Sequence, residues 1–352
     1  GGGLHQPFIP DFNGLAKFDG EVMHTAQWRD EVELNDKNVV VIGSAASAIQ
    51  VIPEIAKIAK TLNVFQRTPN YIIPRGDKKY TSAQQQRFAK YPLLLKLYRW
   101  FIFIRMELIA FPIVKKDSKI GANAAKRINT YMRDSINDTA LHNKLQPKYK
   151  LGCKRILLSD ELYPALNKDN VSLITSPIKQ INNNHIIGED NIKYAADVII
   201  MATGFDISKQ FYSINMVGNN GVTLHEVWSD NETAYKGCSI SDFPNFHMVT
   251  GPNTGAGTIS HVHIIEQELN YIVKLIKLAG THKYIEVKEK EQLKYNLDVQ
   301  AKLNNSVWSS GCSSWYLNAS GVNNTLYPGH GRSFKKLLSD VRIEDYTLTA
   351  KP

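Results

Sequence analysis

The sequence contains few cysteines, and no two of them stand at metal-binding spacing. The three cysteines, Cys153, Cys238 and Cys312, are widely separated along the chain. This distribution excludes a CxxC metal pair and argues against a disulfide framework. A sparse, odd-numbered set of thiols is typical of a protein in a reducing compartment. The first residues also lack the basic and apolar regions of a secretory signal, so we predict a cytoplasmic protein.

The chain also lacks a long uninterrupted apolar run. The most apolar stretch, residues 91–114, contains Lys96, Arg99, Arg105 and Glu107, whereas a membrane-spanning helix needs about 18 consecutive apolar residues. The overall composition, with 43% hydrophobic and 21% charged residues, is that of an ordinary globular protein. It excludes a disordered, collagen-like or coiled-coil chain.

Acidic residues are outnumbered by basic ones. Lys and Arg total 42 against 33 Asp and Glu, a formal charge of +9, which favours an anionic partner such as phosphate, nucleic acid or lipid headgroups. The basic residues are dispersed, without interleaved aromatics or a helix-turn-helix pattern, so nucleic-acid binding is disfavoured. His261 and His263 are too close in sequence to share one helix face, and no Cys or carboxylate stands at ligand spacing. We therefore expect no metal site.

A glycine turn between a strand and a helix is the first motif that carries chemistry. Residues 38–42 form a continuous apolar run typical of a strand buried in a parallel sheet, residues 49–56 have helical spacing, and residues 61–66 predict a second strand. This βαβ unit resembles a dinucleotide-binding unit, whose GxGxxG/A turn presents backbone N–H groups to a pyrophosphate. The turn residues that we assign to cofactor binding are Gly43, Ser44, Ala45, Ser47 and Ala48, with Ala45 in place of the middle glycine.

The end of the second predicted strand indicates which dinucleotide binds. An NAD site usually carries an acidic residue there, for the ribose 2′-hydroxyl. This chain has Arg67 and Thr68 instead. A cation and a hydroxyl suit a 2′-phosphate, which needs charge-assisted donors. We therefore predict NADPH rather than NADH.

The rest of the chain shows a helical insertion between α/β segments. Residues 77–149 are rich in Lys, Arg, Gln and Leu with few glycines and predict several helices, and strands are expected at 171–175 and 196–202. A helix is predicted over about 261–278, followed by a loop-rich tail. Residues 1–35 are interpreted as loop and turn.

A short pattern ahead of the glycine turn identifies a family. Phe18, Gly20, His24 and Trp28 form FxGxxxHxxxW, and this pattern resembles the fingerprint of class B flavin-dependent monooxygenases of the Baeyer–Villiger type. The resemblance implies that His24 fixes the hinge between two nucleotide-binding domains. Further landmarks follow in the family's order over essentially the whole chain, at residues 65–71, 152–155, 202–205, 251–255 and 313–316.

The resemblance implies roles for individual residues. Arg67 and Thr68 are similar to the family's clamp on the NADPH 2′-phosphate, with Lys154 close to it. Arg155 resembles the active-site arginine that stabilises negative charge on the oxygenating flavin and on the ketone adduct; a fixed guanidinium is suited to this. Trp315 resembles the tryptophan that contacts the nicotinamide ribose.

Other resemblances concern FAD. Ala202, Thr203 and Gly204 resemble the turn at a strand end that returns the chain to the flavin domain, and Asn253 and Thr254 lie where the family contacts FAD. The family begins with an earlier GxGxxG unit that holds the ADP part of FAD, and no such unit occurs in these 352 residues. We therefore expect either the C-terminal portion of a longer protein or a truncated product.

The predicted fold class is α/β: a Rossmann-type NADPH domain with a helical insertion, plus the C-terminal part of a second, FAD-type dinucleotide-binding domain. The expected boundaries are a linker at 1–35, the NADPH domain at 36–76 and 150–206, the insertion at 77–149, and the FAD-domain part at 207–352.

The implied reaction uses NADPH, FAD and O₂ to place one oxygen atom in a ketone, giving an ester or lactone, or in an amine or thioether. Two alternatives stay open. One is an NADPH-binding remnant without monooxygenase activity; the other is a protein that contacts a membrane surface through residues 91–116.

Overall fold

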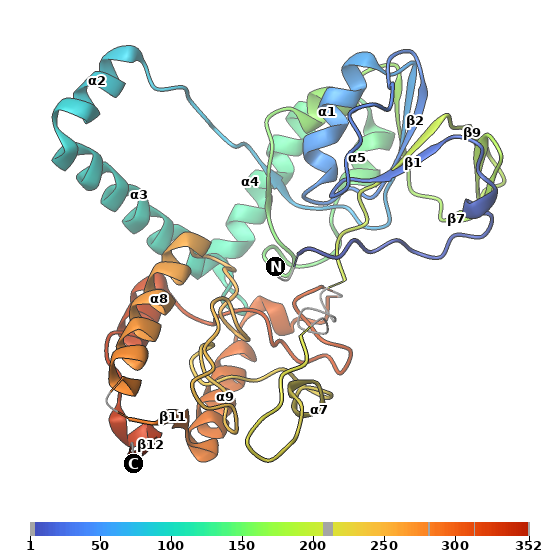
Figure 1. The fold of residues 1–352 in the computed structure, drawn as a ribbon. Helices are drawn as coiled ribbons and strands as arrows, with labels where there is room; N and C mark the ends of the chain where they lie inside the picture. The colour runs from blue at the N-terminus through green and yellow to red at the C-terminus, as the bar shows by residue number, and fades with distance from the viewer. Residues whose placement is uncertain (1–3, 207–213, 281, 313, 351–352) are drawn as a thin grey trace. The chain divides into compact units, whose positions relative to one another are not determined.

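The computed structural model describes residues 4–206, 214–280, 282–312 and 314–350. These residues form two compact units, each built from several chain segments. Unit 1 comprises Gly1–Lys78, Asn123–Tyr149 and Arg155–Gln210; unit 2 comprises Lys79–Ala122, Lys150–Lys154 and Phe211–Pro352. Figure 1 shows the elements of both units.

A parallel five-stranded sheet forms the centre of unit 1. Its strand order is β1-β10-β2-β3-β6, and every neighbouring pair is parallel. The predicted strands and their parallel pairing are confirmed, and the α/β fold class with them. The strands are β1 (Glu21–His24), β2 (Asn38–Ile42), β3 (Thr61–Phe65), β6 (Val171–Ile174) and β10 (Val198–Met201).

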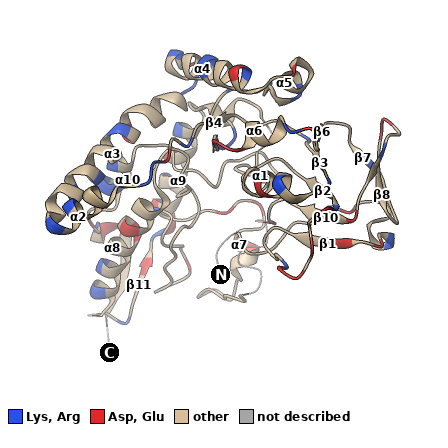
Figure 2. Cartoon of the chain, turned by 90° about the horizontal axis from the view of Figure 1, so that it is seen from above, with Lys and Arg blue, Asp and Glu red and all other residues tan. Residues whose placement is uncertain are grey.

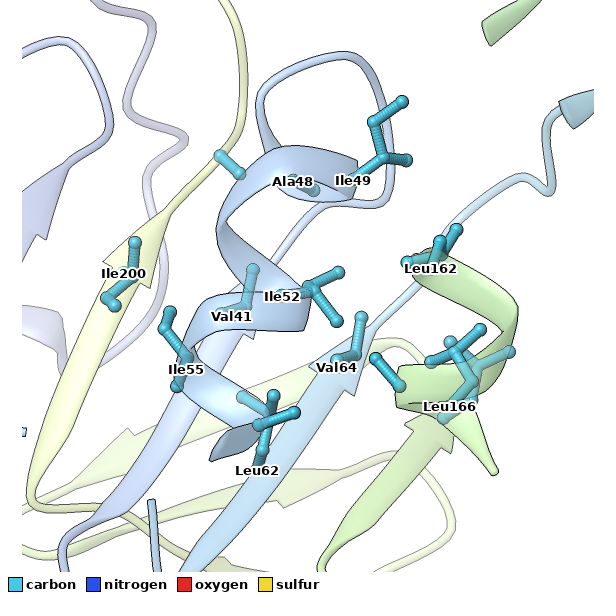
Figure 3. Packing of buried hydrophobic residues seen from close by; sticks show 14 of the residues in the cluster. Val41, Ala48, Ile49, Ile52, Ile55, Leu62, Val64, Leu162, Leu166 and Ile200 are labelled. Atoms are coloured by element: carbon cyan, nitrogen blue, oxygen red, sulfur yellow. The ribbon is translucent and has the colours of Figure 1, made fainter. Parts of the chain in front are cut away.

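The strands carry apolar side chains on both faces because both faces are covered. Val41 and Val64 lie on one face, where α1 (Ala48–Ile58) and α6 (Leu162–Leu166) pack. Figure 3 shows Ile52 of α1 among the side chains of this cluster. The opposite face, which includes Val40, belongs to a second cluster together with residues of an antiparallel three-stranded sheet. That sheet is formed by β7 (Ile178–Asn182), β8 (His185–Gly188) and β9 (Lys193–Ala195).

Smaller elements complete unit 1. A short parallel pair joins β4 (Ile72–Ile73) to β5 (Leu157–Leu158). The remaining elements are the 3₁₀ helix η1 (Leu15–Lys17), helix α5 (Thr139–Leu145), and most of α4 (Lys119–Ser135), whose first turn belongs to unit 2.

Unit 2 is organised around helix α8 (His261–Ala279), which was predicted over nearly the same residues. Its inward side packs with residues of the antiparallel pair β11 (Tyr284–Val287) and β12 (Tyr346–Thr349) and of α10 (Gly331–Leu337). The other elements are α2 (Ser82–Lys90), α3 (Pro92–Ile113), α7 (Leu224–Val227), α9 (Glu289–Leu303), η2 (Val307–Ser309) and η3 (Ile343–Asp345).

Glu107 explains how a charged residue is tolerated in the apolar helix α3. Its side chain is only 8% exposed, and its carboxylate accepts the backbone N–H groups of Gly331 (2.8 Å) and Arg332 (3.2 Å). These donors belong to the first turn of α10 and have no partner within their own helix. The residue that interrupts the apolar run therefore caps another helix.

Two predictions about loops are wrong. Residues 1–35 contain β1, an edge strand of the main sheet, because Glu21–His24 pairs with β10 in parallel register. The C-terminal tail contains the 15-residue helix α9 and the strands β11 and β12. Both α9 and β1 have weak local patterns, and their place is set by partners distant in sequence.

The expected absence of a disulfide framework is also contradicted, because Cys153 and Cys312 are joined by a disulfide bond across 159 residues. Spacing alone gave no indication of this pair, since the fold brings the two positions together. Cys238 is a buried free thiol.

The predicted helical insertion contributes to both units. Helices α2 and α3 belong to unit 2, whereas α5 and most of α4 belong to unit 1. The domain boundaries drawn from the sequence stay a prediction. In the described parts of the chain, no helix is long and apolar enough to cross a membrane.

Candidate functional site

The carboxyl ends of four parallel strands form one row at an edge of the unit 1 sheet. The register pairs His24 with Met201, Met201 with Ile42, and Ile42 with Phe65. The residues that follow these strand ends therefore lie along the same edge, where open α/β sheets bind their ligands. Predicted site residues follow all four strands.

The glycine turn at this edge has the backbone geometry of a dinucleotide-binding turn. Gly43 has φ +113°, and a Cβ at this position would lie 2.4 Å from the carbonyl oxygen of Ala202. Only glycine fits such a position. Ala48, which is fully buried, begins α1, and Ser47 at the N-cap makes no side-chain capping bond in the described structure. The uncapped N-terminus of an 11-residue helix is suited to a phosphate group.

Hydrogen bonds join this turn to the loop after β3. The Ser44 hydroxyl donates to the carbonyl of Thr68 (3.3 Å), and the Asn70 amide donates to the carbonyl of Ser44 (3.1 Å). Asn70 was not among the predicted site residues. The only sequence signal for it is its place just after a proline, in the loop that follows a buried strand.

Arg67 is exposed at the start of this loop. No described residue forms a hydrogen bond or ion pair with its guanidinium group, in contrast to Arg29, which pairs with Glu21. Arg67 is therefore an unpaired cation two residues beyond β3, close in the fold to an uncapped helix N-terminus. Thr68 is half-buried.

Arg155 lies just before β5, in a segment bound to the same loop. The Leu157 N–H donates to the carbonyl of Tyr71 (2.9 Å), and the Tyr149 hydroxyl donates to the carbonyl of Pro69 (3.0 Å). The Arg155 side chain is exposed and likewise has no hydrogen bond or ion pair to the residues described. The two unpaired guanidinium groups, of Arg67 and Arg155, thus lie on two segments of unit 1 that are joined by hydrogen bonds.

The ends of β1 and β10 meet beside the glycine turn. His24 is 2% exposed; its Nδ1 accepts the N–H of Ala26 (3.1 Å), and its ring meets Phe205 edge-on at 5.8 Å. Burial lowers the pKa of His24 below its ordinary value. The Nε2 atom is buried and makes no hydrogen bond to any described residue. A buried neutral histidine of this kind positions backbone rather than carrying charge.

The other predicted residues near this edge have structural partners. The Thr203 hydroxyl donates to the carbonyl of Phe8, and the Phe8 N–H donates to the carbonyl of Gly204 (3.0 Å). These two bonds hold the chain after β10 against the N-terminal segment.

Of the remaining fingerprint residues, Phe18 and Gly20 precede β1 and Trp28 follows its end. A Cβ at Gly20 would lie 2.2 Å from the carbonyl oxygen of Asp197, so the fingerprint glycine permits close backbone approach. Phe18 packs against the sheet, whereas Trp28 is 40% exposed.

Unit 2 holds the other predicted cofactor residues. Asn253 and Thr254 are each 1% exposed. The Asn253 amide donates to the carbonyls of Asn323 (2.8 Å) and Leu326 (3.2 Å), and the Thr254 hydroxyl donates to the carbonyl of Gly251 (2.7 Å). Their side chains are thus engaged in building the loop, and a cofactor contact from them would use main-chain groups.

Lys154 and Trp315 flank the disulfide in sequence. Lys154 directly follows Cys153 and is half-buried, and Trp315 follows Cys312 by three residues. Trp315 is 48% exposed and its ring contacts Tyr316 at 4.7 Å. The structure therefore divides the predicted residues into two sets, one in each unit.

Comparison with known proteins shows which family the sequence matches. Residues 2–230 match the family described as "FMO-like: Flavin-binding monooxygenase-like". The chain is 37% identical to a Baeyer-Villiger monooxygenase of Pseudomonas aeruginosa, in an alignment that covers 100% of this chain and 67% of that protein. It is 36% identical to a Baeyer-Villiger monooxygenase of Streptomyces coelicolor, with coverage of 98% and 67%.

Solved structures give the same picture. A steroid monooxygenase bound to NADP matches with a TM-score of 0.85 and 26% identity, over 99% of this chain and 74% of that one. A cyclohexanone monooxygenase from Rhodococcus sp. Phi1 bound to NADP+ has the same TM-score and coverage at 24% identity, a likeness that shows the fold alone.

Proposed function

The chain belongs to the flavin-binding monooxygenase-like family, and from this premise we propose how its residues serve an NADPH-dependent oxygenation. The protein is a flavin-dependent monooxygenase that uses NADPH, FAD and O₂. Its reaction is a Baeyer–Villiger oxidation, in which one oxygen atom enters a small organic substrate.

The NADPH site lies at the carboxyl edge of the unit 1 sheet. The residues there fit the coenzyme: Gly43 allows the tight turn, the N-terminus of α1 would bind the pyrophosphate, and Arg67 with Thr68 would bind the 2′-phosphate. The observation that carries this proposal is that the guanidinium group of Arg67 is unpaired among the residues described. Arg67 follows β3, and β3 is paired in parallel register with β2, the strand that leads into the glycine turn.

Arg155 stabilises negative charge at the reacting centre. When bound, FAD would activate O₂, which is the source of the oxygen atom that is transferred. A ketone carbonyl gains oxyanion character when it is attacked, and a guanidinium without a competing carboxylate is suited to stabilise that charge. Arg155 would therefore orient the substrate carbonyl and stabilise the negative charge that develops on its oxygen.

Unit 2 supplies residues for the two cofactors. Asn253 and Thr254 shape the loop that we assign to FAD, and Trp315 and Lys154 remain assigned to NADPH by their resemblance to the family. His24 keeps the chain segments after β1 and β10 in register.

The substrate that we propose is a ketone, since the two relatives named above are Baeyer-Villiger monooxygenases. An amine or thioether is the alternative. Product analysis distinguishes them, because a ketone gives an ester or lactone whereas an amine or thioether gives an N- or S-oxide. We also propose a cytoplasmic location, where NADPH is supplied.

The test of the NADPH site is coenzyme preference. Arg67→Ala removes the charge, and Arg75→Ala, which removes another exposed arginine of unit 1, is the matched control. We expect Arg67→Ala to weaken NADPH binding about 10- to 100-fold, the effect of losing one charge-assisted contact, and to leave NADH binding unchanged. Equal losses for both coenzymes, or no loss, would remove the 2′-phosphate assignment.

The same titration separates the enzyme from an NADPH-binding remnant. A remnant binds NADPH with the Arg67 dependence described above but shows no flavin absorbance and no NADPH oxidation with FAD and a ketone present. Substrate-dependent NADPH oxidation excludes the remnant.

A second candidate function, contact with a membrane surface, is favoured by one face of α3. Arg99 pairs with Glu266, and Glu107 caps α10. The opposite face exposes Leu97 (54%), Phe101 (56%) and Leu108 (71%) at helical spacing. Residues 78–106 include Lys and Arg but no Asp or Glu, and Figure 2 shows this basic character along α2 and α3.

Co-sedimentation with vesicles tests this candidate. We expect binding to vesicles that contain phosphatidylglycerol, and loss of that binding in Leu97→Gln/Phe101→Gln. The control variant Leu293→Gln changes an equally exposed leucine of α9 (60%) and should bind as the wild type does. Equal sedimentation of all three proteins would exclude the α3 surface.

A further inference from the structure

The loop of residues 250–254 in unit 2 is held in an unfavourable backbone conformation. Thr250 and Asn253 both have φ +58°, the left-handed region. For a non-glycine residue this region costs about 1–3 kcal/mol, and threonine, which is β-branched, tolerates it poorly. The conformation must therefore be fixed by contacts with the surrounding structure.

Glu268 of helix α8 makes one of these contacts. Its side chain is completely buried, and its Oε2 atom accepts the N–H of Thr250 (2.9 Å). The Thr254 hydroxyl lies close enough to lower the pKa of this carboxyl, although burial has the larger and opposite effect. Glu268 thus binds the backbone at the start of the loop directly.

The second carboxyl oxygen of Glu268 lacks a partner. Oε1 is buried and makes no hydrogen bond to any described residue, and no ion pair to Glu268 is found in the described part of the chain. A buried carboxylate without a cation is strongly destabilised, and such a group avoids the cost by binding a proton.

The titratable groups around Glu268 are either uncharged or make their contacts with other side chains. Cys238 and the buried Tyr295 both interact with its charge, and burial raises the pKa of each well above its ordinary value. Lys236 is the nearby buried cation, but its ammonium group lies over the rings of Tyr235 (5.2 Å) and Tyr271 (4.8 Å). None of these groups compensates a negative charge on Glu268.

We propose that Glu268 is a positioning residue, whose buried carboxyl group holds the 250–254 loop in the conformation that contacts the flavin. The flavin part of this inference rests on the proposed function, which assigns Asn253 and Thr254 to FAD. Glu268 acts through the loop and does not touch the cofactor.

The position of Glu268 makes the loop sensitive to pH near neutrality. Burial raises the pKa of Glu268 from 4.5 to about 7. A group with a raised pKa in the folded state contributes stability that is complete below its unfolded value and is lost as pH rises toward the folded value. The loop should therefore be most firmly held in mildly acidic solution and should loosen as the pH passes about 7.

Hydrogen exchange of the 250–254 backbone over pH 6–8, corrected for the intrinsic pH dependence of exchange, tests the loop directly. In the wild type we expect protection to fall about tenfold across this range, because the uncharged fraction of a group with a pKa of about 7 falls tenfold. Glu268→Gln keeps the shape and the acceptor for Thr250 but carries no charge, so its protection should not change with pH. Glu266→Gln removes an exposed carboxylate from the same helix and should follow the wild type.

The outcomes separate the inference from the proposed function. Loop protection in the wild type that does not depend on pH, or a dependence that persists in Glu268→Gln, would overturn the role of Glu268. In parallel, the FAD dissociation constant should rise with pH in the wild type and not in Glu268→Gln. If the loop responds as expected but FAD affinity does not, Glu268 positions the loop and the assignment of that loop to FAD is wrong.

Discussion

The candidate cations of unit 1 and the candidate FAD residues of unit 2 are held in opposite ways. In unit 1, Arg67 and Arg155 are exposed and unpaired among the residues described; Arg67 follows the end of β3, and Arg155 lies just before β5. In unit 2, Asn253 and Thr254 are buried, and their side chains donate hydrogen bonds to backbone carbonyl groups. Groups left without a protein partner are available to a ligand, whereas groups that satisfy buried backbone determine the shape of a loop.

This difference predicts different consequences of substitution. Changes to the cations of unit 1 should alter binding and catalysis while leaving stability unchanged. Changes to the buried groups of unit 2 should alter stability first. The predictions below test that contrast, from the largest expected effect to the smallest.

Arg155→Ala should reduce the rate of ester formation about 1,000-fold, equivalent to about 4 kcal/mol, because it removes the charge that stabilises the developing oxyanion. Flavin reduction by NADPH and the melting temperature should not change, since the side chain is exposed. Arg155→Lys keeps the positive charge but loses the forked donor geometry, so its rate of ester formation should lie between that of the wild type and that of Arg155→Ala. Undiminished lactone production by Arg155→Ala would refute the role.

Cys312→Ser should lower the free energy of unfolding by about 3 kcal/mol, since the disulfide to Cys153 closes a long loop. Chemical denaturation measures the change. Dithiothreitol should lower the stability of the wild type to that of the variant and should leave the variant unaffected. A wild type insensitive to dithiothreitol would mean that this bond does not stabilise unit 2.

Asn253→Ala should destabilise the protein by about 2 kcal/mol, because the carbonyls of Asn323 and Leu326 lose a buried donor. Asn253→Gly relieves the left-handed backbone but also loses the donor, so the difference between the two variants isolates the backbone contribution. Thermal unfolding of both variants checks this. If Asn253→Ala were as stable as the wild type but failed to bind FAD, the Asn253 side chain would act on the cofactor and not on stability, and the contrast between the two units would be wrong.

Glu266→Gln should change stability by less than about 1 kcal/mol, because its ion pair with Arg99 is exposed on both sides. The melting temperature should fall slightly at low salt and not at all at high salt. A large loss would show that the contact between α3 and α8 depends on this pair.

Local sequence patterns predicted the centre of unit 1. The apolar run before Gly43 and the one ending at Phe65 identify their strands without other information, because strands buried on both faces must be continuously apolar. Residue chemistry after the second run indicated Arg67 as a phosphate ligand, which stays a prediction. The pattern FxGxxxHxxxW identified the family from four positions, and His24 of that pattern lies at the predicted edge of the sheet.

The same patterns failed where long-range partners decide the structure. Residues 21–24 were interpreted as loop because only four residues pair, and their partner β10 lies more than 170 residues later. Glu107 was interpreted as an interruption of an apolar run, whereas it caps α10 from another part of unit 2. Glu268 gave no signal at all, since a glutamate in a helix is usually exposed.

The sequence by itself determined the βαβ unit, its glycine turn and the cations that follow it, because these depend on residues near one another along the chain. Only the tertiary structure decided the insertion of β10 between β1 and β2, the union of Cys153 with Cys312, and the burial of Glu268 beneath a strained loop. Such features arise from the simultaneous packing of distant segments, and the free energy that selects them comes from contacts that no local pattern contains.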